Sequence, residues 1–228
     1  MNFKNRKIIK CVLIILLVLN AHFILYLFNF KIFIFNENFY KKEFQKYGIY
    51  SELKGYDVEK ANNDVLEYFK NKDILIKNDF FNEREKMHLK DVKYLIRQIL
   101  FAFYFSIILF LILSILLAML NKNIKMLIKN FGVVLLFSGL LVLFEGFIFW
   151  LIFLLNFNFA FELMHKTFFM AGTYIFNPSF EKITILYPQE FFYDIAVNIA
   201  INTLVFSFFL FLAGLFIVLY FGIYWKKK

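Results

Sequence analysis

The stretch "LIRQILFAFYFSIILFLILSILLAML" (Leu95–Leu120) decides the fold, because it carries a single charged residue, Arg97, near its start. A helix needs about 20 apolar residues to cross the roughly 30 Å hydrocarbon core of a bilayer, since each residue adds about 1.5 Å. The stretch is long enough to do so. We therefore predict a transmembrane helix here.

Three further apolar stretches have the same character, and apolar residues make up 61% of the 228-residue chain. A soluble domain is about 45–50% apolar. The first stretch is too long for the apolar part of a signal peptide, and no small-x-small cleavage site follows it, so we expect it to stay as an anchor. We predict an all-α membrane protein, a single membrane domain over residues 1–228. Its four transmembrane helices are expected at about residues 8–30, 95–120, 131–157 and 195–225.

The net charge of +9 comes from three short basic clusters that contain no acidic residue. Basic residues flanking spans favour the cytoplasmic side. We therefore predict that both termini face the cytoplasm and that residues 37–93 and 158–194 form an extracytoplasmic cap. Because the charge is explained by topology, we expect no nucleic-acid partner. The clusters are Lys4, Arg6, Lys7 and Lys10; Lys122, Lys125 and Lys129; and Lys226, Lys227 and Lys228.

Two helices are predicted in the first cap segment. In "YDVEKANNDVLEYF" the apolar residues recur at helical spacing from Val58 to Phe69, and Asp57 is a suitable N-cap. In "NEREKMHLKDVKYLI" Asn82 precedes Glu85 by three residues, the spacing of a capping box. The second helix continues into the Leu95–Leu120 span without a helix-breaking residue.

Two short strands are also predicted in the cap. The run "DILI" at residues 73–76 is short and apolar, and "KITILY" at residues 182–187 is bracketed by Pro178 and Pro188. With the helices above, these runs predict a small cap of mixed α/β structure.

Polar side chains within the spans gather toward the predicted outer ends. Helical rise places His22 and Glu145 each roughly 21 Å from the inner end of its span, and Asn198 and Asn202 share a face of the fourth. Ionisable groups in hydrocarbon normally face a bundle interior or a polar cavity. We expect an outward-open polar pocket, with Glu145 paired to Arg97 or to a ligand. The alternative is simple interhelical bonding, while a transporter would spread polar groups over the full depth.

Two of the three histidines, His88 and His165, are predicted near the outer membrane surface, and Asp91 lies one turn after His88. Histidine titrates near neutral pH, so it can move protons in catalysis. The chain has no GxSxG, Walker or dinucleotide-binding glycine pattern. Its only cysteine, Cys11, is expected near the cytoplasmic face. We expect proton chemistry at a lipid-level site, with no metal and no cofactor.

Two blocks of sequence resemble the bacterial lipoprotein intramolecular transacylases, four-span membrane proteins of Gram-positive bacteria. The first is "FNEREKMHLKDVKYL" (Phe81–Leu95), which contains His88. The second is "MHKTFFMAGTYIFNPSFEKITILYPQEFF" (Met164–Phe192), which contains His165. Tyr174 stands where a tryptophan is common in the family. Both side chains are aromatic with a polar tip, so we expect only altered packing or hydrogen bonding there.

The resemblance implies that the sn-2 acyl chain of a diacylglyceryl lipoprotein moves to the α-amino group of its N-terminal cysteine, giving the lyso form. It implies catalysis by His88 and His165, on the outer leaflet of the bacterial cell membrane, with lipoprotein and membrane lipid as partners. We expect the enzyme to be a monomer. Arg84 and Asp91, which lie in the first block, and Tyr56 and Arg97, chosen by position, are expected to support the histidines. Residues expected to contact substrate are Phe168, Phe169, Tyr174, Phe176 and Pro178.

Two other functions remain open from the residues alone. The chain could be a non-enzymatic membrane assembly or structural protein whose histidines are structural. It could also be a lipid hydrolase, which would change the acyl count of its substrate. An intramolecular transfer leaves the substrate mass unchanged, so the three functions are distinguishable.

Overall fold

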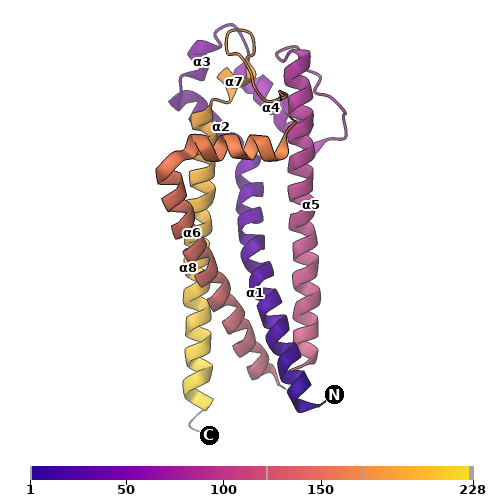
Figure 1. Cartoon of the computed structure of the whole chain (residues 1–228), viewed down its shortest axis with the longest axis vertical. Helices are drawn as coiled ribbons and strands as arrows, with labels where there is room; N and C mark the ends of the chain where they lie inside the picture. The colour runs from indigo at the N-terminus through magenta and orange to yellow at the C-terminus, as the bar shows by residue number, and fades with distance from the viewer. Residues whose placement is uncertain (1, 122, 171, 226–228) are drawn as a thin grey trace. The chain divides into compact units, whose positions relative to one another are not determined.

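The computed structural model describes residues 2–121, 123–170 and 172–225, with backbone alone at residues 3, 152–155 and 223–225. Lys122 and Lys226–Lys228, part of the basic clusters used above, lie outside the described residues. Those described form helices and no strand. In chain order (Figure 1) the helices are α1 Phe3–Ile34, α2 Glu37–Lys46, α3 Ile49–Glu52, α4 Val58–Lys70, α5 Glu83–Met119, α6 Ile124–Phe168, α7 Ile183–Leu186 and α8 Gln189–Trp225.

Four helices are long and apolar enough to cross a membrane, which confirms the expectation of a four-helix, multi-pass membrane protein. The segments are Lys4–Ile34 in α1, Glu83–Met119 in α5, Ile124–Leu151 in α6 and Gln189–Gly222 in α8.

The chain folds into two compact units, which we describe separately. The membrane unit comprises Met1–Phe30, Phe101–Leu151 and Ile199–Lys228. The loop unit comprises Lys31–Leu100 and Ile152–Asn198. Both histidines of interest lie in the loop unit.

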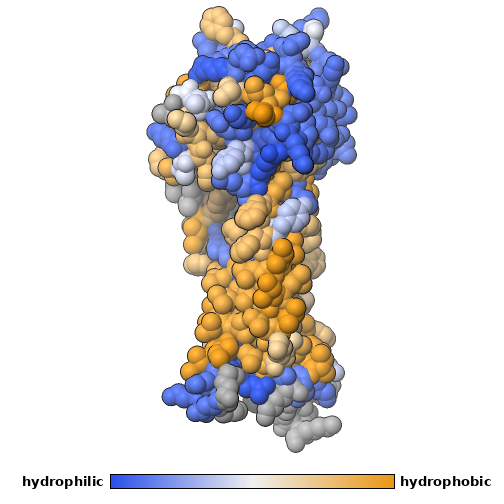
Figure 2. Space-filling model, turned by 90° about the vertical axis from the view of Figure 1, so that its right-hand side faces the viewer, coloured by the Kyte–Doolittle hydropathy of each residue, from blue (hydrophilic) through white to orange (hydrophobic). Residues whose placement is uncertain are grey.

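The membrane unit packs around a small buried cluster of leucine and valine. Leu13 and Leu17 of α1 meet Leu113 and Leu117 of α5 and Val134 of α6. Most other apolar side chains of these helices are exposed, and Figure 2 shows the hydrophobic surface that results. A lipid-facing surface needs to be apolar, so this distribution agrees with membrane insertion.

Two ionisable residues of the spans, Glu145 and Arg97, have partners within their own unit. In the membrane unit Glu145 faces His22, with 3.7 Å between Oε1 and Nε2. In the loop unit the Arg97 guanidinium donates to the backbone carbonyl of Asn71. Glu145 and Arg97, which we expected to pair or to bind a ligand, therefore each engage a neighbour in their own unit.

The loop unit is built on α4 and an aromatic cluster. The predicted α4 is confirmed: the Asp57 carboxylate accepts a hydrogen bond from the Lys60 amide at 2.9 Å, and the face from Val58 to Phe69 is buried. The Tyr187 hydroxyl donates to Asn62 on α4 at 2.9 Å. Four rings pack at this centre: Tyr40, Phe44, Tyr187 and Phe191.

The predicted α/β cap is wrong, since the described residues contain no strand. "KITILY" forms the single turn α7, in which the Leu186 amide donates to the Lys182 carbonyl at 2.8 Å. Residues 73–76 are irregular because side chains take the carbonyls that a strand would pair. Lys93 donates to the Asp73 carbonyl and Tyr68 to that of Ile74. Short apolar runs do not by themselves distinguish a strand from a helical turn.

Helices α6 and α8 approach closely through glycines, so we expect Gly139→Ala to destabilise the membrane unit. A Cβ at Gly139 would lie 2.6 Å from the Ser207 carbonyl oxygen and 2.7 Å from the Phe211 amide nitrogen. Both are backbone atoms that cannot move aside. Gly222→Ala is the matched control, because nothing lies within 4 Å of its added Cβ. Thermal unfolding in detergent should show a lowered Tm for Gly139→Ala only. An unchanged Tm for Gly139→Ala would contradict the packing described.

Candidate active site

The start of α5 is fixed by a capping box, as predicted. The Glu85 amide donates to Asn82 Oδ1 at 2.9 Å, and the Asn82 amide donates to Glu85 Oε2 at 2.6 Å. The other carboxylate oxygen of Glu85 accepts from the Ile183 amide at 2.7 Å. His88 follows three residues later and is buried, with 8% of its surface exposed. The capping box therefore fixes the position of His88 within the loop unit.

His165 lies on a helical segment that begins after an interruption of α6. Asn156 has extended backbone angles (φ −170°, ψ 90°), and its side-chain oxygen accepts from the Phe159 amide at 3.1 Å. A new helical segment therefore starts at Phe157 and runs to Phe168. This segment was predicted as part of an outer loop, and the helix-capping asparagine was the signal in the sequence that could have revealed it.

The two imidazoles face each other within the loop unit. Their ring centroids are 6.5 Å apart and their planes differ by 14°. Phe169 contacts both rings, at 5.0 Å from His88 and 5.4 Å from His165. Phe176 adds an edge contact to His88 at 5.2 Å, and Tyr174 contacts His165 at the same distance. The result is a pair of histidines within one aromatic wall.

The tautomer of His165 follows from its hydrogen bond. Its Nδ1 lies 2.8 Å from the Phe161 carbonyl oxygen, which can only accept. Nδ1 therefore carries the proton, and Nε2 of the neutral ring has a free lone pair. Burial lowers the pKa of His165, and the bond to Phe161 opposes that shift in part. The ring is thus suited to accept a proton near neutral pH.

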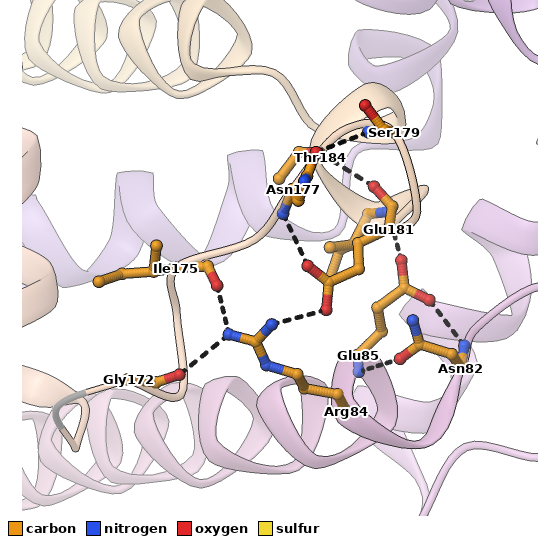
Figure 3. Close-up of polar contacts among 10 residues, drawn as sticks. Asn82, Arg84, Glu85, Gly172, Ile175, Asn177, Ser179, Glu181 and Thr184 are labelled. Atoms are coloured by element: carbon orange, nitrogen blue, oxygen red, sulfur yellow. Dashed lines mark hydrogen bonds and ion pairs between the residues drawn. The ribbon is translucent and has the colours of Figure 1, made fainter.

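Arg84 fastens the loop that carries the aromatic wall (Figure 3). Its guanidinium donates to the Glu181 carboxylate at 2.9 Å, to the Gly172 carbonyl at 3.1 Å and to the Ile175 carbonyl. It also lies over the Phe176 ring, 5.1 Å from the centroid. One arginine therefore holds both ends of the turn that presents Tyr174.

Two buried carboxylates complete this framework. Glu181 is 6% exposed and, besides Arg84, accepts from the Asn177 amide at 2.7 Å. Glu85 is 1% exposed and joins α5 to α7 through the Ile183 amide (Figure 3). Neither carboxylate was singled out as a site residue from sequence, although each lies within one of the two blocks that resemble the family. Both oxygens of each are engaged, so their role is to position the site.

A family model described as lipoprotein intramolecular transacylase Lit matches residues 12–192, which include both blocks and both histidines.

This chain belongs to the Lit family.

Lit proteins of known structure share this fold. The membrane-integral Lit of Bacillus cereus, solved in meso, superposes with a TM-score of 0.79 at 20% identity, over 92% of this chain and 96% of that one. A second structure of the same protein, with a histidine replaced by arginine, gives 0.77 at 19% identity, over 95% of each chain. Among curated protein sequences none matches. As a Lit family member the chain is an acyltransferase that acts on lipoprotein, so the non-enzymatic alternative is not supported.

Three of the residues expected to support the Lit histidines form no bond with them in the part of the chain that is described. Asp91 is half-buried on α5 and Arg97 bonds to Asn71. Tyr56 packs against Phe80, and the Lys182 ammonium lies 4.5 Å from the centroid of its ring. Within the described residues none of the three forms a hydrogen bond, ion pair or ring contact with either histidine. Arg84 is the expected supporting residue that the structure brings to the site.

The residues expected to contact the Lit substrate divide into two groups. Phe169, Tyr174 and Phe176 form the wall around the imidazoles. Phe168 is 57% exposed and Pro178 is exposed, and neither ring contacts a histidine in the part of the chain that is described. Tyr174, at the position where the resemblance led us to expect tryptophan, contacts His165.

We expect Arg84→Lys to loosen the loop and to lower activity. Lysine keeps the charge but lacks the planar fork that reaches a carboxylate and two carbonyls together. Hydrogen exchange of residues 172–177 should rise in Arg84→Lys. Lys86→Gln is the control, since Lys86 forms a neighbouring ion pair with the exposed Glu83 only. Equal exchange in Arg84→Lys and wild type would contradict the positioning role.

His165 should titrate below the usual histidine pKa of about 6.5, because burial disfavours the imidazolium. NMR of histidine ring carbons in detergent-solubilised protein would follow this directly. The His165→Ala spectrum assigns the signal among the three histidines. A midpoint above 6.5 would show that the ring is stabilised as the cation, contrary to its burial.

Proposed function

We propose that the enzyme moves the sn-2 acyl chain of a diacylglyceryl lipoprotein onto the α-amino group of the N-terminal cysteine. The product is the lyso form, N-acylated and S-monoacylglycerylated. The observation that carries this proposal is the facing pair His88 and His165 in an aromatic enclosure. A centroid separation of 6.5 Å brings both imidazoles close enough to act on one substrate molecule.

The chemistry needs positioning more than a protein nucleophile. Ester and amine belong to one substrate molecule, and well-oriented intramolecular reactions reach effective molarities of about 10⁵ M or more. An acyl-enzyme is therefore unnecessary. The aromatic wall of Phe169, Tyr174 and Phe176 limits access of water, which would otherwise compete with the amine for the ester.

The two histidines take different roles in this proposal. The α-amine has a pKa of about 7.7–8.0, so part of it has already lost a proton to water near neutral pH and can attack the ester. His165 is the base that takes the second proton from the attacking nitrogen, because its Nε2 lone pair is free. His88 is buried, which disfavours the imidazolium, so this ring is neutral and passes that proton from His165 to the departing glycerol oxygen. A C–N bond forms, a C–O bond breaks, and both rings end neutral.

One buried nitrogen of His88 lacks a hydrogen-bond partner, and this supports direct contact between His88 and the substrate. His88 Nδ1 is buried and has no hydrogen-bond partner within the described residues. An unpaired buried polar atom costs roughly 1–3 kcal/mol. The glycerol oxygen or the amine of the substrate would supply the missing partner. The substrate thus completes the hydrogen bonding of the site.

Other residues have proposed roles at greater distance. Phe168 and Pro178 are exposed and are proposed to meet the acyl chains. Arg97 and Tyr56 act indirectly, by holding the segments that lead into α5 and α7. Asp91 is proposed to act on His88 through the shared helix face. We infer that no metal or cofactor takes part and that one copy of the chain is sufficient.

We also propose that both termini face the cytoplasm and that the site opens to the outer leaflet. The basic residues of the N-terminal segment and of the α5–α6 connection support this orientation. These two regions are tied together, because Arg6 donates to the Leu120 carbonyl at 2.9 Å and Lys10 donates to Asn121 at 3.0 Å. They must therefore lie on the same side of the membrane.

Loss of either histidine should abolish acyl transfer. We expect His88→Ala and His165→Ala to reduce the lyso form at least about 100-fold, the lower range for losing a general acid or base. The measurement is tandem mass spectrometry of lipoprotein N-terminal peptides, in which the acyl chain moves from glycerol to amine at unchanged total mass.

Met87→Ala and Lys166→Ala are the matched controls, since each is a partly exposed neighbour of one histidine. Both should keep near wild-type activity. Full activity in both histidine variants would overturn the mechanism, and release of free fatty acid by the wild type would point to a hydrolase.

The orientation predicts which cysteines react from outside the cell. In a Cys11→Ser background, Ile74→Cys should label with a membrane-impermeant maleimide in intact cells, because residue 74 is 75% exposed. The native Cys11, also exposed, should label only after the membrane is opened. The reverse pattern would invert the proposed topology.

A further inference from the structure

The segment from Phe157 to Phe180 carries apolar side chains that the mechanism does not use. Phe161, His165, Phe169, Tyr174 and Phe176 contact one another or the histidines, and Phe168 is proposed above to meet the acyl chains of the substrate. Five further large apolar side chains are exposed, and we call them the outer face of the segment. They are Phe159 (61%), Leu163 (51%), Met170 (78%), Ile175 (65%) and Phe180 (80%).

This exposure is unusual within the loop unit. Across residues 36–93, all of which are described, Ile74 and Met87 are the exposed side chains among isoleucine, leucine, valine, phenylalanine and methionine. Contiguous apolar surface on this scale marks an interaction site for protein, ligand or membrane. The outer face therefore needs an occupant.

The chain itself keeps this segment near the membrane. Phe157 follows Leu151, up to which the α6 span is described, by six residues. That is roughly 9 Å of helix and at most about 20 Å of extended chain. The last described turns of this span carry exposed aromatic residues, among them Phe147 and Trp150, a residue type enriched at the membrane–water interface. Phe157 to Phe168 must therefore begin within that distance of the lipid surface.

The helical part has the composition of an interfacial helix. Phe159 and Leu163 are four residues apart, so they project from one side. Glu162 and Lys166 lie beside them and form an ion pair at 2.6 Å, which keeps charge at the edge of the apolar stripe. Helices that lie in the interface bury an apolar face about 5–10 Å into the boundary of headgroups and acyl chains.

We propose that residues 157–180 form a membrane-interface element, with the five exposed apolar side chains of the outer face in contact with lipid acyl chains. His165 lies on the opposite side of the same helical segment. Lipid contact would therefore hold the imidazole pair at the depth of the glycerol esters. This inference adds to the proposed function a way for the site to reach a substrate that is embedded in the membrane. The lipid contact itself does not depend on the proposed function; its consequence for catalysis rests on that function.

The test is quenching of tryptophan fluorescence by lipids brominated on their acyl chains. In a Trp150→Phe, Trp225→Phe background, Leu163→Trp is compared with Ile74→Trp in phosphatidylcholine vesicles. Both positions are exposed, and only residue 163 belongs to the proposed element. We expect brominated lipid to quench Leu163→Trp at least twofold more than Ile74→Trp, and aqueous iodide to show the opposite order.

The results of the quenching experiment distinguish lipid from water and from protein as the occupant of the outer face. Quenching of Leu163→Trp by iodide but not by lipid would overturn the proposal. Protection from both quenchers would also overturn it, because a protein or a second copy would then cover the face. The measurement needs no substrate, so it stays informative if the proposed reaction is wrong. A second readout is activity in vesicles, where Leu163→Asp should lose about tenfold and Ile74→Asp should lose little.

Discussion

The site depends on one buried carboxylate, Glu85. A charge that is 1% exposed is tolerated only if its hydrogen bonds are complete, and both oxygens of Glu85 are engaged. One oxygen closes the first turn of α5, and the other closes the turn α7. The helix that carries His88 and the loop that follows His165 are thereby joined at one point. Arg84, the preceding residue, extends the same junction to Glu181 and to the Gly172–Ile175 turn.

The aromatic side chains around the two histidines determine which chemistry the site can perform. Phenylalanine and tyrosine rings around two imidazoles disfavour the imidazolium, so the base is neutral where the amine is still protonated. The same rings offer apolar surface to acyl chains. A site with many polar groups would admit water and favour hydrolysis. A site without the histidines would have no base to take the proton that the attacking nitrogen loses.

Sequence analysis predicted the framework better than its details. The four spans follow from uninterrupted apolar runs, and the α4 cap and the Asn82–Glu85 box follow from residue types at fixed spacing. The pairing of His88 with His165 came from topology, which places both near the outer membrane surface, and from the family resemblance, since no local pattern joins residues 77 positions apart. The strands were wrong, because carbonyl groups of residues 73–74 bond to Tyr68 and Lys93. The helix to Phe168 was missed because a single residue, Asn156, interrupts α6. The partners of Glu145 and Arg97 could not be inferred from depth alone.

The central claim is that acyl transfer occurs within one lipoprotein molecule, between groups held by His88 and His165, without an acyl-enzyme. A crossover experiment tests it directly. Purified enzyme receives an equal mixture of two substrates, one with deuterated acyl chains and unlabelled peptide, the other with unlabelled chains and isotope-labelled peptide. The account predicts that every N-acylated product pairs chain and peptide from the same parent molecule. Crossed products, with a deuterated chain on a labelled peptide, would contradict it.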